Sequence, residues 1–179
     1  MKILVVGCET HFFFMEKEIE LQNLINEYFT SSDYKIIENV IRGEKGTRVL
    51  EIFIDNEKGI NIDEITKINK DLSSLIDEKI DMFNISNLVV SSPGAERPLK
   101  FYWQLKKHAG RVLEIEMNDG EKIEGKLEEF PESSDVKEGE EKITVEITVK
   151  EKGKKNTVYP REIKFKDIKE VKVKLRFTK

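Results

Sequence analysis

The sequence predicts an α+β protein made of two small domains, an N-terminal two-layer α/β domain and a C-terminal five-stranded β-barrel. Helical and strand-like periodicities alternate as far as residue 91, whereas from residue 111 onward only period-two patterns occur. Between them lies a segment with two prolines, Ser91–Pro98. A length of 179 residues is sufficient for two such domains.

Two amphipathic helices are expected in the N-terminal half. Residues 15–29 carry apolar side chains at every third or fourth position, which form a single stripe. A second helix is expected from Asn61, which can cap it together with Glu64 in a capping box, to about Lys79. The two stripes consist of Leu21, Leu24, Ile25, Tyr28 and Phe29, and of Ile65, Ile68, Leu72, Leu75 and Ile76. Because a helix cannot bury such a stripe alone, both helices should lie on one face of a sheet.

Three strands complete this domain in the order helix, strand, strand, helix, strand. Residues 34–42 and 48–55 are separated by a glycine-containing turn and form a hairpin, and residues 84–91 form the third strand. We expect the sheet to be antiparallel and the domain to span residues 15–91. Residues 1–14 are either an extra edge strand or sequence upstream of a start at Met15, and the helical pattern that begins at Met15 favours the second interpretation.

The second half predicts a short helix followed by a small barrel, in a domain spanning residues 99–179. The helix covers residues 99–109, with Gly110 as its C-cap. Asn118-Asp119-Gly120 is a strong hairpin signal, and Gly125 permits a bend within the next strand. The five strands expected are residues 111–117, 121–130, 143–149, 157–165 and 170–177, with an acidic loop at 131–141. Short, bent antiparallel strands of this kind indicate a closed barrel.

Composition and motifs argue for binding rather than catalysis. Lys and Arg number 11 and Asp and Glu 18 in residues 1–98, against 20 and 17 in residues 99–179, so only the second half is basic. A single cysteine, Cys8, excludes an internal disulfide, and no segment approaches the length of a membrane span. Nucleophile elbows, phosphate-binding loops, dinucleotide-binding glycine patterns and metal-binding histidine pairs are all missing from the sequence. We therefore expect a cytoplasmic protein without enzymatic activity, cofactor, metal or small-molecule substrate.

The segment between the domains is the most informative part of the chain. Its two prolines fix φ, and Gly94 after Pro93 supplies the positive φ of a type II turn. Ser91 and Ser92 can satisfy backbone groups at the strand end. Residues 92–98 are thus a rigid junction. Two interpretations remain: a purely structural hinge with Arg97 paired to an internal carboxylate, or a surface that also contacts a partner.

The segment VVSSPGAERPLK, followed by an aromatic helix and Gly110, resembles the signature of the ribosome maturation factor RimP family. The resemblance extends over about residues 15–179. It implies an N-terminal α/β domain and a C-terminal Sm-like barrel, in a bacterial cytoplasmic factor that binds the immature 30S small ribosomal subunit and assists its maturation without catalysis. Val89 stands where the family usually has an acidic residue, which removes one possible partner of Arg97, and Glu96 stands where it usually has Asp.

Two further features are candidate contacts. Lys172, Lys174 and Arg176 alternate with apolar residues and form a basic row on one strand face, which either contacts phosphates or is simply solvated. Tyr102, in a run of three aromatic residues, is exposed for stacking if its two neighbours pack between the domains. The candidate partner-binding residues are Ser91, Ser92, Pro93, Gly94, Arg97, Pro98, Lys100, Tyr102, Lys172, Lys174 and Arg176.

The expected partner is the small ribosomal subunit, through its proteins and its rRNA, with no membrane contact and with the chain acting as a monomer. An alternative is an Sm-like RNA-binding regulator that acts outside ribosome assembly. Such regulators form rings through strand edges, so a monomeric state would argue against that alternative.

Overall fold

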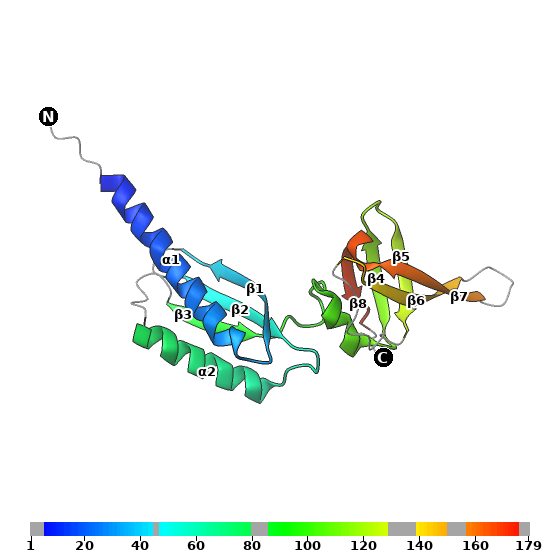
Figure 1. Cartoon of the computed structure of the whole chain (residues 1–179), viewed down its shortest axis with the longest axis horizontal. Helices are drawn as coiled ribbons and strands as arrows, with labels where there is room; N and C mark the ends of the chain where they lie inside the picture. Colours follow the sequence, from blue (N-terminus) through cyan, green and yellow to red (C-terminus); the bar gives the residue numbers. More distant parts are fainter. Residues whose placement is uncertain (1–5, 45–46, 80–85, 129–138, 150–156, 176–179) are drawn as a thin grey trace. The chain divides into compact units, whose positions relative to one another are not determined.

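The computed structural model describes residues 6–44, 47–79, 86–128, 139–149 and 157–175. The chain divides into two compact units, Met1–Asn56 with Ile60–Ser92, and Pro93–Lys179 with Glu57–Gly59. Each unit has its own sheet and its own hydrophobic core (Figure 1). The main break between them, at Ser92 and Pro93, falls in the proline-rich segment.

The first helix is longer than the sequence pattern suggested. Helix α1 spans Val6–Thr30, so residues 6–14 belong to it and do not form the edge strand that was the less favoured of the two alternatives. From residue 8 to residue 42 the chain has neither glycine nor proline, and an established helix extends through such a stretch because each added residue contributes a hydrogen bond. The predicted stripe is confirmed, since Leu21, Leu24, Ile25 and Phe29 are buried in the core of the first unit.

Helix α2 (Ile62–Lys79) begins with the predicted capping box. The Glu64 backbone N–H donates to Asn61 Oδ1, and the Asn61 N–H donates to a Glu64 carboxylate oxygen, both at 2.9 Å. Ile68, Leu72 and Ile76 are buried, and Ile65 and Leu75 pack at the edge of the same core. Both helices lie on one face of the sheet (Figure 1), where their stripes meet Leu50, Ile52, Ile54, Leu88 and Val90.

The first sheet is mixed, which corrects the antiparallel sheet expected from the sequence. Its order is β1 (Lys35–Arg42), β2 (Val49–Asp55), β3 (Asn87–Ser91); β1 pairs antiparallel with β2, but β3 pairs parallel with β2. The reason is the crossover through α2, which carries the chain back to the end of the sheet at which β2 begins. Among the outward-facing groups of edge strand β3, the Val90 N–H donates to Asn69 Oδ1 of α2 at 2.8 Å.

The short helix of the second unit is a 3-10 helix, η1 (Tyr102–His108), rather than an α-helix over residues 99–109. Its start is delayed because Leu99 is held by the sheet: the Leu99 N–H donates to the Val171 carbonyl at 2.8 Å. Gly110 follows with φ of 79°, as the predicted C-cap requires.

The second sheet is antiparallel and five-stranded, with the order β7-β6-β5-β4-β8. The Asn118-Asp119-Gly120 turn joins β4 to β5 as predicted, with Gly120 at φ of 89°. The last strand ends before residue 177, and the acidic loop lies mostly outside the described residues. The bounds are β4 (Val112–Met117), β5 (Lys122–Leu127), β6 (Lys142–Val149), β7 (Thr157–Lys164) and β8 (Ile168–Val173).

This sheet curls, because its two edge strands are consecutive in the chain. Only the 3-10 turn η2 (Phe165–Asp167) separates β7 from β8, although three strands lie between them in the sheet. The Asn118 N–H donates to the Asp167 carbonyl at 2.9 Å, and the Asn118 amide donates to the Lys166 carbonyl at 3.0 Å. No ladder joins β7 to β8 within the described part of the chain, so closure into a barrel stays a prediction.

Gly125 lies where β5 and β6 approach closely. A Cβ at this position would be 3.1 Å from the Glu146 carbonyl oxygen and 3.1 Å from Cβ of Val145. The sequence suggested a bend at this glycine, and the contact distances show that the missing side chain lets the neighbouring strand pass.

Replacing Asn61 with alanine should lower the free energy of unfolding by about 1 kcal/mol, because α2 loses its N-cap. Glu64→Ala removes the reciprocal bond of the same box, so the double variant should lose less than the two single variants added together. Urea unfolding followed by circular dichroism measures all three. Strictly additive losses would show that the two bonds do not act as a unit.

Candidate interaction surface

The junction residues form a connection with defined backbone geometry. Ser91 ends β3 and its hydroxyl donates to the Ser92 carbonyl at 3.1 Å. Gly94 has φ of 72°, which confirms the predicted left-handed position after Pro93. Arg97 is partly buried rather than freely extended into solvent. The Ser91 hydroxyl and the positive φ of Gly94 thus act within the junction itself.

The chain after Pro98 is anchored on the second unit. Pro98 is partly buried, and Leu99 enters the core with 8% of its surface exposed. Gln104 is fully buried, and its Oε1 accepts hydrogen bonds from the backbone N–H groups of Lys100 at 2.9 Å and Phe101 at 3.1 Å. Nothing in the sequence pattern indicated this role, because a glutamine in a polar-aromatic segment ordinarily faces solvent. Lys100 itself is exposed.

Among the three aromatic residues, the structure reverses the expected exposure. Tyr102 is partly buried: its hydroxyl donates to the Lys142 carbonyl at 2.8 Å, and its ring meets Phe165 edge-on at 5.7 Å between centroids. Phe101 is 40% exposed and stacks on Trp103 at 6.1 Å. Tyr102 therefore holds η1 on the sheet, and burial with the nearby Glu141 raises its pKa above the ordinary 10.0.

The predicted basic row is not a row of free cations. Lys172 pairs with Glu170 at 2.6 Å, and Lys174 pairs with Glu114 at 3.7 Å and also binds Glu124. Arg176 lies outside the described residues, so the row is described only as far as Leu175. Exposed pairs of this kind contribute roughly 0–1 kcal/mol each, so they can be exchanged for other partners.

The strand register explains the pairing of Lys174. Glu114 of β4 lies directly opposite Glu124 on β5 and opposite Lys172 on β8. Two carboxylates facing each other across a ladder repel, and Lys174 reaches between them to form ion pairs with both. Lysine at 174 therefore has a structural use that the alternation within its own strand does not reveal.

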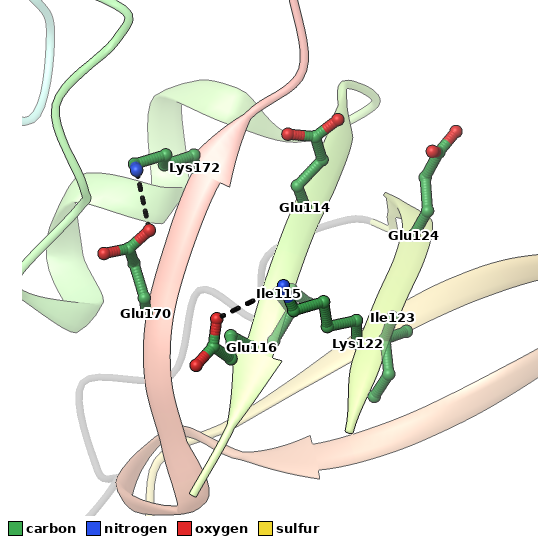
Figure 2. A pocket seen from close by; sticks show the side chains of 8 residues that line it. All are labelled: Glu114, Ile115, Glu116, Lys122, Ile123, Glu124, Glu170 and Lys172. Atoms are coloured by element: carbon green, nitrogen blue, oxygen red, sulfur yellow. Dashed lines mark ion pairs between the residues drawn. The ribbon is translucent and has the colours of Figure 1, made fainter. Parts of the chain in front are cut away.

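A glutamate of β4 also forms two ion pairs with lysines at the next outward-facing position. Glu116 lies opposite Lys122 on β5 and opposite Glu170 on β8, and its carboxylate pairs with Lys122 at 3.9 Å and with Lys169 at 2.5 Å. Figure 2 shows the glutamates and lysines of these three strands around a shallow hollow of about 350 Å3, lined by Glu114, Ile115, Glu116, Lys122, Ile123, Glu124, Glu170 and Lys172. We call this the acidic hollow, because four of its eight lining residues are glutamates.

The ion pairs set the titration of this face. A hydrogen bond from Lys169 lowers the pKa of Glu116 below 4.5, and a hydrogen bond to Glu124 raises the pKa of Lys174 above 10.5. The Glu116 contribution to stability is present above its unfolded pKa and is lost as pH falls through its folded value. The Lys174 contribution is present below its unfolded pKa and is lost as pH rises through its folded value. Glu116 and Lys174 thus both stay charged throughout the neutral range.

A second hollow on the same sheet has a different charge. It has a volume of about 530 Å3 and is lined by Gly110, Arg111, Val112, Lys126, Lys174 and Leu175. We call it the cationic hollow, because three of its six lining residues are basic and none is acidic. Arg111 and Lys126 were not among the residues singled out from the sequence. The Asp-Gly turn fixes the β4–β5 register and places Lys126 beside Val112. The position of this turn in the sequence could therefore have predicted that Lys126 lies close to Arg111.

Among the described residues, no group of three or more His, Cys, Asp or Glu side chains is arranged to hold a metal ion. In the same part of the chain, no helix combines the length and the apolar character needed to cross a bilayer. The glutamates of the acidic hollow are therefore best understood through their lysine partners.

Comparison with known proteins agrees with the architecture. Residues 24–96 match the family model described as the RimP N-terminal domain. The match covers the end of α1, all of β1–β3 and α2, and most of the junction. Over 170 aligned residues the chain is 28% identical to the protein named ribosome maturation factor RimP from Cytophaga hutchinsonii. That alignment covers 90% of this chain and 98% of the relative.

Fold and surface define a two-unit α+β protein in which a proline-fixed junction connects a helix-covered mixed sheet to a curled antiparallel sheet. The family-model match in the first unit and the relative that spans both units point to the same family. Both comparisons therefore support a relationship between this chain and the ribosome maturation factor RimP family.

Tyr102→Phe should lower the free energy of unfolding by about 1 kcal/mol, because the hydrogen bond to the Lys142 carbonyl is lost while the ring stays. The matched control is Tyr159→Phe, whose side chain is 42% exposed on β7. Urea unfolding of both variants measures their free energies of unfolding. An unchanged midpoint for Tyr102→Phe would contradict a structural role of the hydroxyl.

Proposed function

We propose that the chain is a cytoplasmic, non-catalytic assembly factor that binds the immature 30S small ribosomal subunit and assists its maturation. The observation that carries this proposal is the alignment with the Cytophaga hutchinsonii ribosome maturation factor, which includes 98% of that protein and both units of this chain. A relative that shared only one unit would support a common domain but not a common function. The regulator outside ribosome assembly has no comparable support.

We extend the proposal to the second unit, which we interpret as a closed Sm-like barrel with the boundaries 99–179. The three-residue η2 connection brings the edge strands together at one end, and Asn118 ties that end to the β4–β5 turn. Arg161 of β7 also reaches Glu121 with two hydrogen bonds, of 2.6 and 2.7 Å. These contacts support curling far beyond a flat sheet.

The binding surface in this proposal combines the exposed part of the junction with the end of β8. The junction contributes exposed Gly94 and partly buried Arg97, and exposed Lys100 follows it. Lys172 and Lys174 contribute amines whose carboxylate partners are themselves exposed, so that an RNA phosphate or a protein carboxylate can replace them. Their pairing makes the surface selective, because a weakly charged partner does not displace the glutamates.

Purified chain should co-sediment with small subunits from cells blocked in maturation, and much less with mature ribosomes. Charge reversal at Lys172, Lys174 and Arg176 to glutamate should weaken this association by roughly ten-fold or more at 0.1 M salt, because favourable phosphate contacts become repulsive. The matched control reverses three exposed lysines of α2, at Lys67, Lys70 and Lys79.

The control variant should bind as the unchanged chain does. Equal distribution of the chain between immature and mature particles would contradict the assembly role. Equal loss in both triple variants would show that total charge, and not the end of β8, determines binding.

A further inference from the structure

We propose that the cationic hollow is a binding site for the sugar-phosphate backbone of single-stranded RNA, with Arg111 and Lys126 as its phosphate ligands. This inference rests on the proposed ribosomal function and names the partner chemistry at one place on the second unit. The hollow has a volume of about 530 Å3 and no acidic residue in its lining. It differs in this from the acidic hollow of the same sheet, which four glutamates line.

Arg111 is the strongest candidate contact. It is exposed, and in the part of the chain that the structure describes its guanidinium forms neither an ion pair nor a hydrogen bond. Lys122, Lys169, Lys172 and Lys174 all pair with glutamates of β4, β5 or β8. An unpaired guanidinium keeps its planar set of donors for a ligand, and phosphate oxygens match that set in pairs.

Lys126 is the second ligand because of the register. It lies opposite Val112 on β4, the residue that follows Arg111. The Lys174 backbone N–H donates to the Val112 carbonyl at 2.8 Å, so Lys174, Val112 and Lys126 form one row across three neighbouring chain segments. Lys126 pairs with Glu146 only at 3.7 Å and both side chains are exposed, so phosphate can take the place of that carboxylate. Lys174 adds positive charge that Glu114 and Glu124 partly neutralise.

The rest of the lining fits a nucleotide better than an isolated anion. Val112 is partly buried and Leu175 is 38% exposed, which gives the hollow an apolar wall beside its cations. Gly110 has no side chain, and the space that a Cβ would occupy has no neighbour within 4 Å. A ribose or base can therefore lie against Leu175 while its phosphate meets Arg111. Single-stranded RNA supplies both groups in one chain.

Fluorescence anisotropy with a labelled 12-nucleotide oligouridylate tests the site on the full chain without any ribosomal particle. The test variant is Arg111→Gln with Lys126→Gln. Each lost phosphate contact should lower affinity roughly five-fold at 0.1 M salt and reduce the slope of log affinity against log salt by about 0.7. The matched control is Lys122→Gln with Lys169→Gln, which removes the same charge beside the acidic hollow.

Loss of RNA affinity and of salt slope in the test variant, with both retained in the control, is the expected result. Equal behaviour of the two variants, or no RNA binding by the unchanged chain, would overturn the site. A 12-residue polyglutamate probe that binds as tightly as the RNA and depends on the same residues would also overturn it, in favour of an acidic protein. Because sedimentation with subunits is measured separately, failure of the RNA site and failure of the assembly role remain distinguishable.

Discussion

The three-residue connection between β7 and β8 is the constraint on which the second unit depends. These strands form opposite edges of a five-stranded sheet, yet Phe165–Asp167 is all that separates them in sequence. A flat sheet would place them about 19 Å apart at the usual strand spacing, more than three residues comfortably span while also forming a 3-10 turn. The sheet must therefore curl. Asn118 fixes the curled end through η2, and Gly125 allows β6 to pass close to β5.

Curling determines what the outer face can bind. Once β8 lies beside β4, the register sets Glu114 between Lys172 of β8 and Glu124 of β5, and sets Glu116 between Glu170 of β8 and Lys122 of β5. Among the residues that the structure describes, most cations of this face form such ion pairs, whereas the guanidinium of Arg111, just before β4, forms none. Charge on this surface is therefore a property of the ladder and not of any single strand. A protein that binds a particle transiently benefits from such a face, because exchangeable ion pairs keep association reversible.

The sequence predicted elements well wherever local chemistry decides the structure. The Asn61–Glu64 capping box, the Asp119-Gly120 turn and the positive φ of Gly94 depend on neighbouring residues only, and all are confirmed. The sequence did not predict the features that depend on contacts between segments far apart in the chain. The parallel pairing of β3 follows from the α2 crossover, and the pairing of Lys174 follows from the carboxylate of Glu114 on β4, about 60 residues away in sequence. The exposure of Tyr102 was predicted wrongly because its partners, Lys142 and Phe165, are also distant in sequence.

Native-state hydrogen exchange by NMR on the full chain tests the curling constraint most directly. Arg161→Met removes the paired hydrogen bonds to Glu121 that join β7 to the start of β5. If the sheet is one curled, cooperative unit, amide protection should fall together in β4, β5, β7 and β8 and stay unchanged in β1–β3. Loss of protection confined to β7, with β4 and β8 unaffected, would contradict the account, because the two edge strands would then be independent.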